Sequence, residues 1–379
     1  MTDQDGLSIV LLAAAGSAHT CRWADMLSGA GHRVVVASWQ TGPEVPGADL
    51  RIAPAVGATP LRRVPLAALW LRRLIREVRP DVVHVHSLGT YALLSLALPG
   101  GSARVLSPYG GDLRAARDSA ARAAMLGVAL RRADMVLPCS AELGAEVMER
   151  YAVPPTRVRV LSWGVAENLI AAHSSISRGA VRSAFGIPGD ATVVLSVRST
   201  SATYRTLEIV SAFADAATSR PDLFLVVLAG GRLDRESARR AQEAYFGRVR
   251  EETRTVADRV LIVERTLGQR QTFELMSASD LAVSIPPGDQ HSYSVLEAAL
   301  AGCRLLLSDI APYREMVSDG LAAELLAEPI CSTLAQWLRV ASADEASRRR
   351  NKEFILTHEH GADKLAAHEW IYRRLSARA

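Results

Sequence analysis

The sequence predicts an α/β protein of two domains, each a doubly wound parallel sheet with helices on both faces. Apolar runs such as residues 7–14 and 82–87 lack polar alternation, which is typical of strands buried on both faces. Helix-like stretches separate these runs, and the same series restarts after residue 184. The length of 379 residues suits two domains of ordinary size.

The elements of the first half follow from short Val/Leu-rich runs bounded by Gly, Pro or Ser. Helices are expected between them, for example over residues 20–31 and 141–153. The expected strands are residues 7–14, 33–38, 82–87, 103–108, 135–140 and 158–163.

The second half repeats this alternation, with a helix expected near residues 204–217. Between the halves, residues 164–180 are rich in Ser and Ala and show no apolar period, so we interpret them as a linker. The expected strands of the second half are residues 192–199, 223–230, 259–264, 281–285 and 304–309.

Composition excludes several classes of protein. Hydrophobic content of 49% and charged content of 22% argue against large-scale disorder. The net charge of +4 suits an acidic small molecule or an anionic membrane surface, and no nucleic-acid-binding signature is present. The four cysteines are widely spaced without a CxxC, which favours reduced thiols and a cytoplasmic location. The N-terminus lacks a basic region, and its apolar run is too short to span a bilayer.

The stretch "SIPPGDQHSYSVLEAALAGCRLLLSD" carries the main chemical signal. Its loop should lead into a helix capped by Ser292 or Ser294 and ended by Gly302, and free N–H groups at such a helix start favour phosphate. Asp289 would lie in that loop. Glu297 stands among apolar residues on the helix, where it either accepts hydrogen bonds from ribose hydroxyls or simply occupies a solvated face.

Two further basic elements each allow two interpretations. Arg198 and Arg205 could converge on a diphosphate, or could be solvated loop arginines. Residues 60–80 should form a helix with Leu, Ala and Trp side chains on one side and arginines around it. We favour a crossover helix packed on the sheet with a solvated basic face over peripheral attachment to a membrane surface.

Ordered motifs over nearly the whole chain resemble a known family. They include "SAHTCRWADMLSGAGHRVVVAS", "VVHVHSLGTYALL", "LSPYGGDL" and "DQHSYSVLEAALAGCRLLLSDIAPYRE". Together they resemble the retaining, family-four type glycosyltransferases (glycosyl transferases group 1) of the GT-B fold.

The resemblance implies two Rossmann-like domains facing a cleft. Residues 1–165 would form the N-terminal acceptor-side domain and residues 166–360 the C-terminal nucleotide-sugar donor-binding domain. Residues 361–379 would form a helix that packs back on the first domain.

The resemblance also assigns roles to residues of the donor site. Glu297 matches the glutamate that binds the ribose, Asp289 stands where a glutamate contacts the sugar, and Arg198 matches the arginine that neutralises the diphosphate. The remaining donor-side residues are Gln290, His291 and Ser292 beside the sugar and phosphate, and Gly16 and Ser17 in a loop that closes over the donor.

Two departures from the family pattern change the expected site. Tyr204, followed by Arg205, stands where the family has Lys, so Arg205 is the expected substitute. On the acceptor side, Tyr109 and Asp112 take the place of a loop histidine and its surroundings. His86 and His19 are further acceptor-side candidates.

The implied activity is retaining, metal-independent transfer of a sugar, of the hexosyltransferase type, from a nucleoside-diphosphate sugar to an acceptor hydroxyl. The expected catalytic residues are Asp289, Arg198, Arg205 and His86, and no cofactor is implied. Alternatives are a nucleotide-sugar epimerase of the same fold and a non-catalytic nucleotide-binding relative. A nicotinamide dehydrogenase fits least, because "AAAGSAHT" is not G-x-G-x-x-G.

Overall fold

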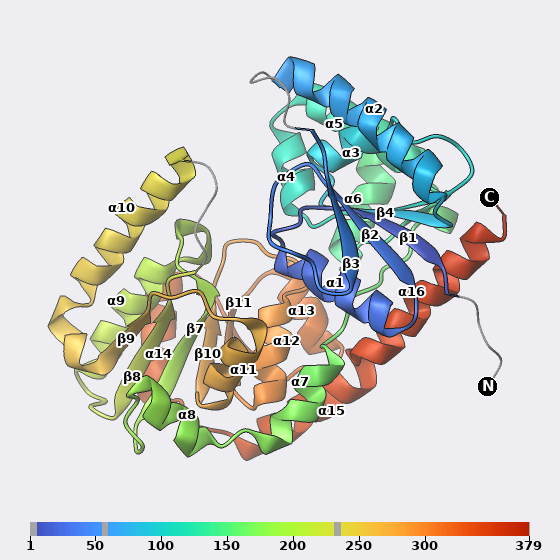
Figure 1. Ribbon diagram of the computed structural model, residues 1–379. Coiled ribbons are helices and arrows are strands. Elements are labelled where there is room, and N and C mark those ends of the chain that lie inside the picture. Colours follow the sequence, from blue (N-terminus) through green and yellow to red (C-terminus); the bar gives the residue numbers. More distant parts are fainter. Residues whose placement is uncertain (1–5, 55–59, 231–235, 379) are drawn as a thin grey trace. The chain divides into compact units, whose positions relative to one another are not determined.

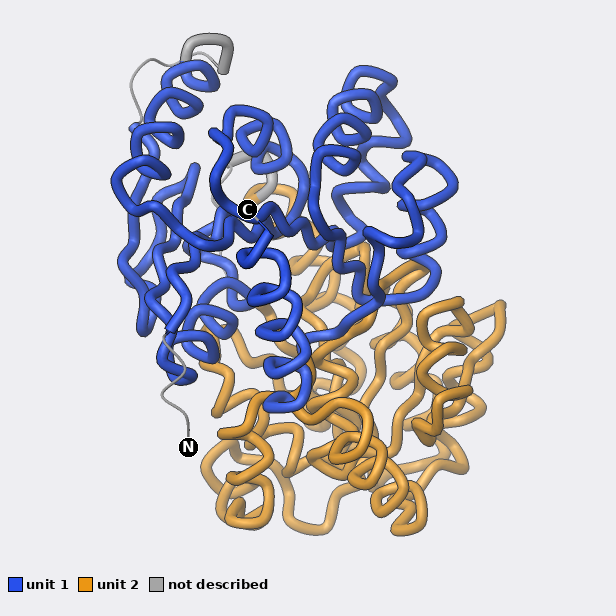
Figure 2. The backbone as a smooth tube through the Cα atoms, turned by 90° about the vertical axis from the view of Figure 1, so that its right-hand side faces the viewer, with its two compact units in different colours: residues 1–163, 361–379 blue, residues 164–360 orange. Residues whose placement is uncertain are grey.

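The computed structural model describes residues 6–54, 60–230 and 236–378. The chain divides into two compact units, which are coloured separately in Figure 2. Unit 1 consists of residues 1–163 and 361–379, and unit 2 consists of residues 164–360. Each unit contains one six-stranded parallel sheet with helices around it (Figure 1). The predicted doubly wound α/β architecture is therefore confirmed.

The sheet of unit 1 has the strand order β3-β2-β1-β4-β5-β6, and every neighbouring pair is parallel. The central strand β1 pairs through Ile9 with Val34 on one side and with Val82 on the other. The strands are β1 (Ser8–Leu12), β2 (Arg33–Ser38), β3 (Ala48–Ile52), β4 (Val82–His86), β5 (Ala103–Ser107) and β6 (Met135–Val136).

Two expectations for unit 1 differ from the structure. Strand β3 was not expected, because "ADLRI" is half-exposed at the sheet edge and lacks a continuous apolar run. Residues 158–163 do not form a strand, and only Val158 makes an isolated bridge, to Val136. Two-residue β6 leaves little edge to extend, so the chain leaves the sheet there.

Helices α2 to α6 of unit 1 bury their apolar sides against the sheet in one continuous core. The last helix, α16, belongs to this unit, where its Tyr372 hydroxyl contacts both Trp23 and His84. The helices are α1 (Ala18–Gly29), α2 (Pro60–Val78), α3 (Thr90–Ser95), α4 (Gly111–Arg117), α5 (Ala120–Arg131), α6 (Ala141–Tyr151) and α16 (Gly361–Ser376), with a 3-10 turn at Pro155–Arg157.

The sheet of unit 2 has the order β12-β11-β10-β7-β8-β9 and is also parallel throughout. Alternate residues of β7 enter different cores: Val193 and Leu195 pack on one face, and Val194 packs on the other. This explains the unbroken apolar runs, because both faces of the sheet are covered. The strands are β7 (Thr192–Ser199), β8 (Leu223–Leu228), β9 (Val260–Val263), β10 (Leu281–Ser284), β11 (Arg304–Ser308) and β12 (Ala323–Leu326).

The expected linker over residues 164–180 is wrong in part. It contains a short helix with Leu169 buried, so it belongs to the packed part of unit 2. The helices are α7 (Glu167–Ala172), α8 (Arg178–Phe185), α9 (Thr206–Ala217), α10 (Glu236–Glu252), α11 (Gln269–Ser277), α12 (Tyr293–Ala301), α13 (Ala311–Ser318), α14 (Ile330–Val340) and α15 (Glu345–His358), with 3-10 turns at His173–Ser175, Ala202–Tyr204 and Arg254–Arg259.

Each sheet has one position where the chain reverses the direction in which it adds strands. This position lies between β1 and β4 in unit 1 and between β7 and β10 in unit 2. In open α/β sheets, ligands bind outside the carboxyl ends of the strands at such a switch point. The loops after β4, β7 and β10 are therefore the segments in which to look for a site.

Candidate functional site

Arg198 is the central side chain at the switch point of unit 2. It stands at the carboxyl end of β7, and the loop after the neighbouring strand β10 reaches the same edge. Its Nη1 donates to Asp289 Oδ2 at 2.9 Å, to Ser292 Oγ and to Ser294 Oγ at 3.3 Å. Its Nη2 donates to the Tyr204 hydroxyl at 2.6 Å. Burial is the largest single influence and lowers the pKa of Arg198, but Asp289, Tyr204 and Tyr313 together act more strongly in the opposite direction, so the pKa is raised.

The Arg198 guanidinium keeps unused hydrogen-bonding capacity. A guanidinium has five N–H donors in a fixed planar fork. Among the residues that the structure describes, Nε–H and the second hydrogen of Nη2 have no acceptor. A partly buried cation with two remaining donors is suited to a phosphate, which accepts hydrogen bonds in that geometry.

Asp289 is held on one side, which leaves it a free oxygen. Its Oδ2 accepts from Arg198 and from the Tyr313 hydroxyl, the latter at 2.8 Å. Tyr313 lies on α13 and is fully buried, and burial raises the pKa of its phenol. Ser284 Oγ lies 3.0 Å from the same hydroxyl and donates to it. Oδ1 of Asp289 has no hydrogen-bond partner among the described residues, so it could accept from a hydroxyl.

Tyr204 is the residue that the sequence resemblance placed at the position of a Lys. Its ring packs against the Arg198 guanidinium with 4.2 Å from Arg198 Cζ to the ring centroid. Arg205 points elsewhere: it begins α9 with a positive φ of 51° and pairs with Glu328 at 2.6 Å. Tyr204, and not Arg205, therefore contacts Arg198.

The start of α12 lies next to Arg198, which contacts Ser292 and Ser294. Ser292 is the N-cap residue, as expected, but its side chain contacts Arg198 and makes no capping hydrogen bond. The first N–H groups of any α-helix have no carbonyl partner within the helix, and they favour an anion. At its other end the helix stops at Gly302 with a φ of 90°, a backbone conformation that favours glycine.

Glu297 is buried on α12, with 8% of its surface exposed. The interpretation that it occupies a solvated face is therefore wrong. Its Oε1 accepts a hydrogen bond from Gln269 Nε2, at the start of α11, at 2.9 Å. A buried carboxylate requires hydrogen-bond donors, so this position has the chemistry needed to accept from ribose hydroxyls.

The two residues between Asp289 and Ser292 lie in the same loop. His291 Nε2 lies 3.1 Å from Glu359 Oε1, although the geometry is not that of a hydrogen bond. Gln290 is partly buried beside it. The structure thus brings Asp289, Ser292 and Arg198 into direct contact and turns His291 toward Glu359.

His86 occupies the switch point of unit 1 at the end of β4. Its Nδ1 lies 3.1 Å from the Tyr109 hydroxyl, and its buried Nε2 has no hydrogen-bond partner among the described residues. Burial, followed by the positive charges of His368 and His19, lowers the pKa of His86 to about 3. His86 is therefore a neutral imidazole at physiological pH.

His84 is a packing residue, as its place inside the strand suggested. It is fully buried, with Nδ1 2.6 Å from the Tyr372 hydroxyl and Nε2 2.8 Å from Ser107 Oγ. The same Tyr372 hydroxyl also accepts from Trp23 Nε1. Trp23 and Trp163 are buried, and their stacked rings lie 5.6 Å apart.

Asp112 fastens two loops of unit 1 to each other. Its carboxylate accepts from the backbone N–H groups of Leu88 at 2.6 Å, Tyr109 at 3.1 Å and Leu113 at 2.9 Å. Burial raises its pKa, and these hydrogen bonds act in the opposite direction. Asp112 thereby fixes Tyr109 beside His86.

The loop after β1 carries the remaining candidates of unit 1. Gly16 is exposed and Ser17 is the N-cap of α1. A Cβ on Gly42 would lie 2.8 Å from the Gly16 nitrogen, so two loops approach closely there. His19 is exposed, with its ring 5.6 Å from the rings of Tyr109 and Trp163.

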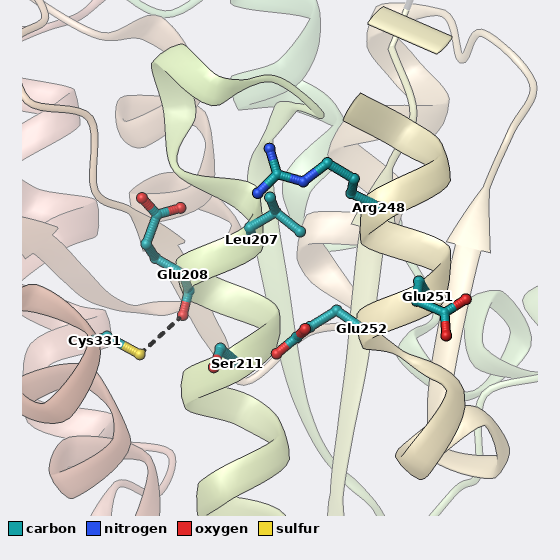
Figure 3. Close-up of a pocket in the computed structure, with 7 residues that line it drawn as sticks. All are labelled: Leu207, Glu208, Ser211, Arg248, Glu251, Glu252 and Cys331. Carbon is teal, nitrogen blue, oxygen red and sulfur yellow. Dashed lines mark hydrogen bonds between the residues drawn. The ribbon is translucent and has the colours of Figure 1, made fainter. Parts of the chain in front are cut away.

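A separate hollow in unit 2, of about 410 Å³, lies among α9, α10 and α14 (Figure 3). Glu208, Glu251 and Glu252 line it with a single cation, Arg248. Three carboxylates against one guanidinium repel a diphosphate, so this hollow is not the candidate donor site. In the described part of the chain, no group of three or more His, Cys, Asp or Glu residues is arranged to hold a metal ion.

Sequence reasoning missed Tyr313, Ser284 and Gln269. Tyr313 donates to Asp289, Ser284 hydrogen-bonds the Tyr313 hydroxyl, and Gln269 donates to Glu297. Tyr313 lies inside the quoted motif, and Ser284 lies near the end of an expected strand. Both are close to Asp289 in the sequence signal, so they could have been named as candidates. Gln269 has no such signal, because it lies 28 residues before Glu297.

These two sheets with their surrounding helices define the GT-B class of fold. The sequence model of the family described as Glycosyltransferase Family 4 matches residues 16–169. The resemblance to this family and the predicted fold class are thereby confirmed. A search of the curated proteins found no match to the chain.

Solved structures agree over almost the whole chain. HepE of Anabaena in complex with UDP and glucose is 15% identical, with a TM-score of 0.76, 98% of this chain and 100% of HepE covered. Sucrose-phosphate synthase of Thermosynechococcus elongatus is 17% identical, with a TM-score of 0.79 and coverage of 98% and 100%. A glycosyltransferase of Rickettsia africae is 13% identical, with a TM-score of 0.74 and coverage of 98% and 99%.

Proposed function

We propose that the protein is a retaining glycosyltransferase that transfers a sugar from a nucleoside-diphosphate sugar to an acceptor hydroxyl. The observation that carries this proposal is Arg198, a partly buried cation with two unused donors at the β7/β10 switch point. The match to Glycosyltransferase Family 4 and the likeness to HepE, solved with UDP and with UDP-glucose, support it.

Unit 2 would bind the donor. Arg198 and the start of α12 would contact the diphosphate, and the buried Glu297 would accept hydrogen bonds from the ribose. Asp289 would accept from a sugar hydroxyl through Oδ1, while Tyr313 and Arg198 hold Oδ2. Gln290 and His291 would line the sugar side of the same loop.

The chemistry follows from the charges at this site. As the bond from the anomeric carbon to the diphosphate breaks, negative charge grows on the leaving phosphate, and Arg198 stabilises that charge. The acceptor hydroxyl attacks from the same face, and the departing phosphate oxygen takes its proton. This route requires no strong protein base, and the positive charge comes from arginine, so no divalent metal is needed.

Arg205 would have a smaller part than the sequence suggested. Its pairing with the exposed Glu328 would have to open before it could reach a diphosphate. Tyr204 instead keeps Arg198 in position through its hydroxyl and ring.

Unit 1 would supply the acceptor side. His86 and Tyr109 form a neutral pair. Nε2 of His86, which has no partner among the described residues, can form one hydrogen bond with an acceptor hydroxyl. His19 lies next to Tyr109, while Gly16 and Ser17 would contact the donor from this unit. The four free cysteines support a reducing, cytoplasmic location.

The test is turnover with nucleoside-diphosphate sugars carrying uridine, guanosine or adenosine, with and without EDTA, against a panel of hydroxyl-bearing acceptors. We expect a glycosylated product that keeps the anomeric configuration of the donor, with EDTA leaving the rate unchanged. Product analysis by NMR reads the configuration directly.

Other outcomes would contradict the proposal. A new sugar nucleotide formed without acceptor would indicate an epimerase, and donor binding without transfer would indicate a non-catalytic relative. An inverted product would exclude retention, and complete loss of turnover in EDTA would exclude metal independence. A variant of Arg198 has a matched control in Arg304→Ala. Arg304 forms a partly buried ion pair with Glu324 in the same sheet, at the amino end of β11.

A further inference from the structure

Helix α2 of unit 1 has an unusual solvent face. Its inner side enters the core through Ala67, Leu71, Leu74 and Ile75, as expected for a helix packed on a sheet. A packed helix normally presents polar residues on the opposite side. In α2 that side carries aliphatic side chains as well as arginines.

Leu69 marks the middle of this solvent face. It is 65% exposed, and Leu66 is 41% exposed. At about 100° per residue, Leu69 lies roughly opposite the centre of the buried stripe. The expectation that the Leu, Ala and Trp side chains of this helix lie on one side is therefore wrong for these two leucines.

Arginines lie around the two leucines. Arg72, Arg73 and Arg76 are exposed and form no ion pair with any described residue. Arg76 lies two turns from Leu69, and Arg73 lies one turn from it, on the same side of the helix. Glu77, the exposed acidic residue of the helix, lies 3.8 Å from Arg51 and is thus partly neutralised.

Arg63, nearer the start of the helix, does not join this face. Its guanidinium lies 4.1 Å from the Trp39 ring centroid and donates to the Trp39 carbonyl at 2.5 Å. The unpaired positive charge of α2 is therefore concentrated toward its second half, next to the exposed leucines.

We propose that the α2 face, defined as Leu66, Leu69, Arg72, Arg73 and Arg76, binds an anionic lipid surface. Exposed aliphatic side chains flanked by arginines are the features of helices that lie flat in a membrane interface. The leucines would enter the acyl boundary while the arginines contact lipid phosphates. None of the helices in the described residues has the length and hydropathy to cross a membrane, so this contact would be peripheral.

The same features favour lipid over an acidic protein. An acidic protein would pair with the arginines but gains little from two single leucines on a convex helix, since protein hot spots fill pockets. A lipid surface accommodates both kinds of side chain at once. This inference goes beyond the proposed transfer reaction and does not depend on it.

The test is co-sedimentation of the full chain with vesicles of phosphatidylcholine alone, or mixed with an equal amount of phosphatidylglycerol. We expect binding to the mixed vesicles only. The triple variant Arg72→Ser, Arg73→Ser, Arg76→Ser should lower the partition coefficient about 100-fold, since each arginine near such a surface contributes about fivefold. Leu66→Gln with Leu69→Gln should lower it about tenfold or more.

A control variant distinguishes an effect of the α2 face from an effect of the net charge of the chain. Arg33, Arg122 and Arg349 are exposed, and their side chains form no ion pair with a described residue. Changing these three to Ser removes the same charge and should leave binding within about twofold, with all variants melting at the temperature of the parent chain. Equal losses in both triple variants, or no binding by the parent chain, would overturn the proposal. Binding of polyglutamate that the leucine variant leaves unchanged would assign the face to an acidic protein.

Discussion

The switch points of the two sheets differ in charge, although the order in which strands are added is the same in both. At the β1/β4 position, His86, Tyr109 and the buried His84 form a neutral aromatic group. At the β7/β10 position, Arg198 and Asp289 form an ion pair next to a helix start. The fold fixes where a ligand can bind, and the residues at that position decide whether the ligand is neutral or anionic.

The largest expected effect comes from removing the charge at the β7/β10 position. Arg198→Ala should lower kcat/KM for the donor about 10²–10³-fold, as for loss of one donor to a developing anion. The variant also leaves the Asp289 carboxylate without its cation. Steady-state kinetics with varied donor measures this loss.

Arg304→Ala provides the comparison for Arg198→Ala. It should destabilise the same sheet without a change in donor kcat/KM beyond about twofold, because Arg304 lies at the opposite end of its strand. If both variants lost activity equally, loss of stability rather than of a phosphate contact would explain the result.

The neutral group of unit 1 predicts a pH dependence of stability. Burial lowers the pKa of His86 to about 3 and of His368 to about 4, below the unfolded value of about 6.5. The unfolded chain therefore binds more protons in this window, and stability falls as pH drops below about 6.5. From pH 7 to pH 5.5, these two groups should lower the unfolding free energy by about 2.5 kcal/mol.

Tryptophan fluorescence during urea unfolding measures this change in unit 1, which holds most of the tryptophans. Between pH 7 and pH 5.5, His368→Phe should reduce the slope by about 0.8 kcal/mol per pH unit, because the unfolded histidine binds about 0.6 of a proton on average in this range. A slope identical to that of the parent chain would show that His368 is not held neutral. The tryptophans of unit 1 are Trp23, Trp39, Trp70, Trp163 and Trp370, and Trp337 lies in unit 2.

Glu297→Gln should have a smaller effect on the charged site. The amide keeps the shape but accepts hydrogen bonds less strongly, so nucleotide affinity should fall about tenfold, or ~1.4 kcal/mol. Isothermal titration should give the same loss for the free nucleoside diphosphate and for its sugar derivative, because only the ribose contact changes. A loss confined to the sugar derivative would instead assign Glu297 to the sugar.

The smallest effect is expected at Tyr204. Tyr204→Phe keeps the ring on Arg198 but removes the hydroxyl that accepts from Nη2. Since the guanidinium can turn to water at this partly exposed position, donor KM should rise about three- to tenfold with kcat nearly unchanged. An unchanged KM would mean that the ring alone positions Arg198.

Strand positions were predictable where a strand is buried on both faces. The run at residues 192–199 matches β7 to the residue, because Val193, Val194 and Leu195 all enter the core. The edge strands β3 and β12 (Ala323–Leu326) have mixed exposure, so periodicity does not distinguish them from loops. Helix α7 inside the expected linker was missed because a six-residue helix is too short to display a period.

The candidate site was predictable only as a set of residues, not as contacts. The sequence places Arg198 and Asp289 91 residues apart, and only the pairing of β7 with β10 brings them together. The substitution of Tyr204 for Lys suggested Arg205 as the replacement cation. In the structure Arg205 has a positive φ, and its side chain pairs with Glu328 instead. No sequence pattern indicates this ion pair.

A crystal structure of the chain with a bound nucleoside-diphosphate sugar tests the central claim most directly. We expect the diphosphate to lie within hydrogen-bonding distance of the Arg198 guanidinium and the start of α12. We expect the ribose hydroxyls to donate to Glu297. A nucleotide bound elsewhere, with Arg198 and Glu297 keeping only their present protein contacts, would contradict it.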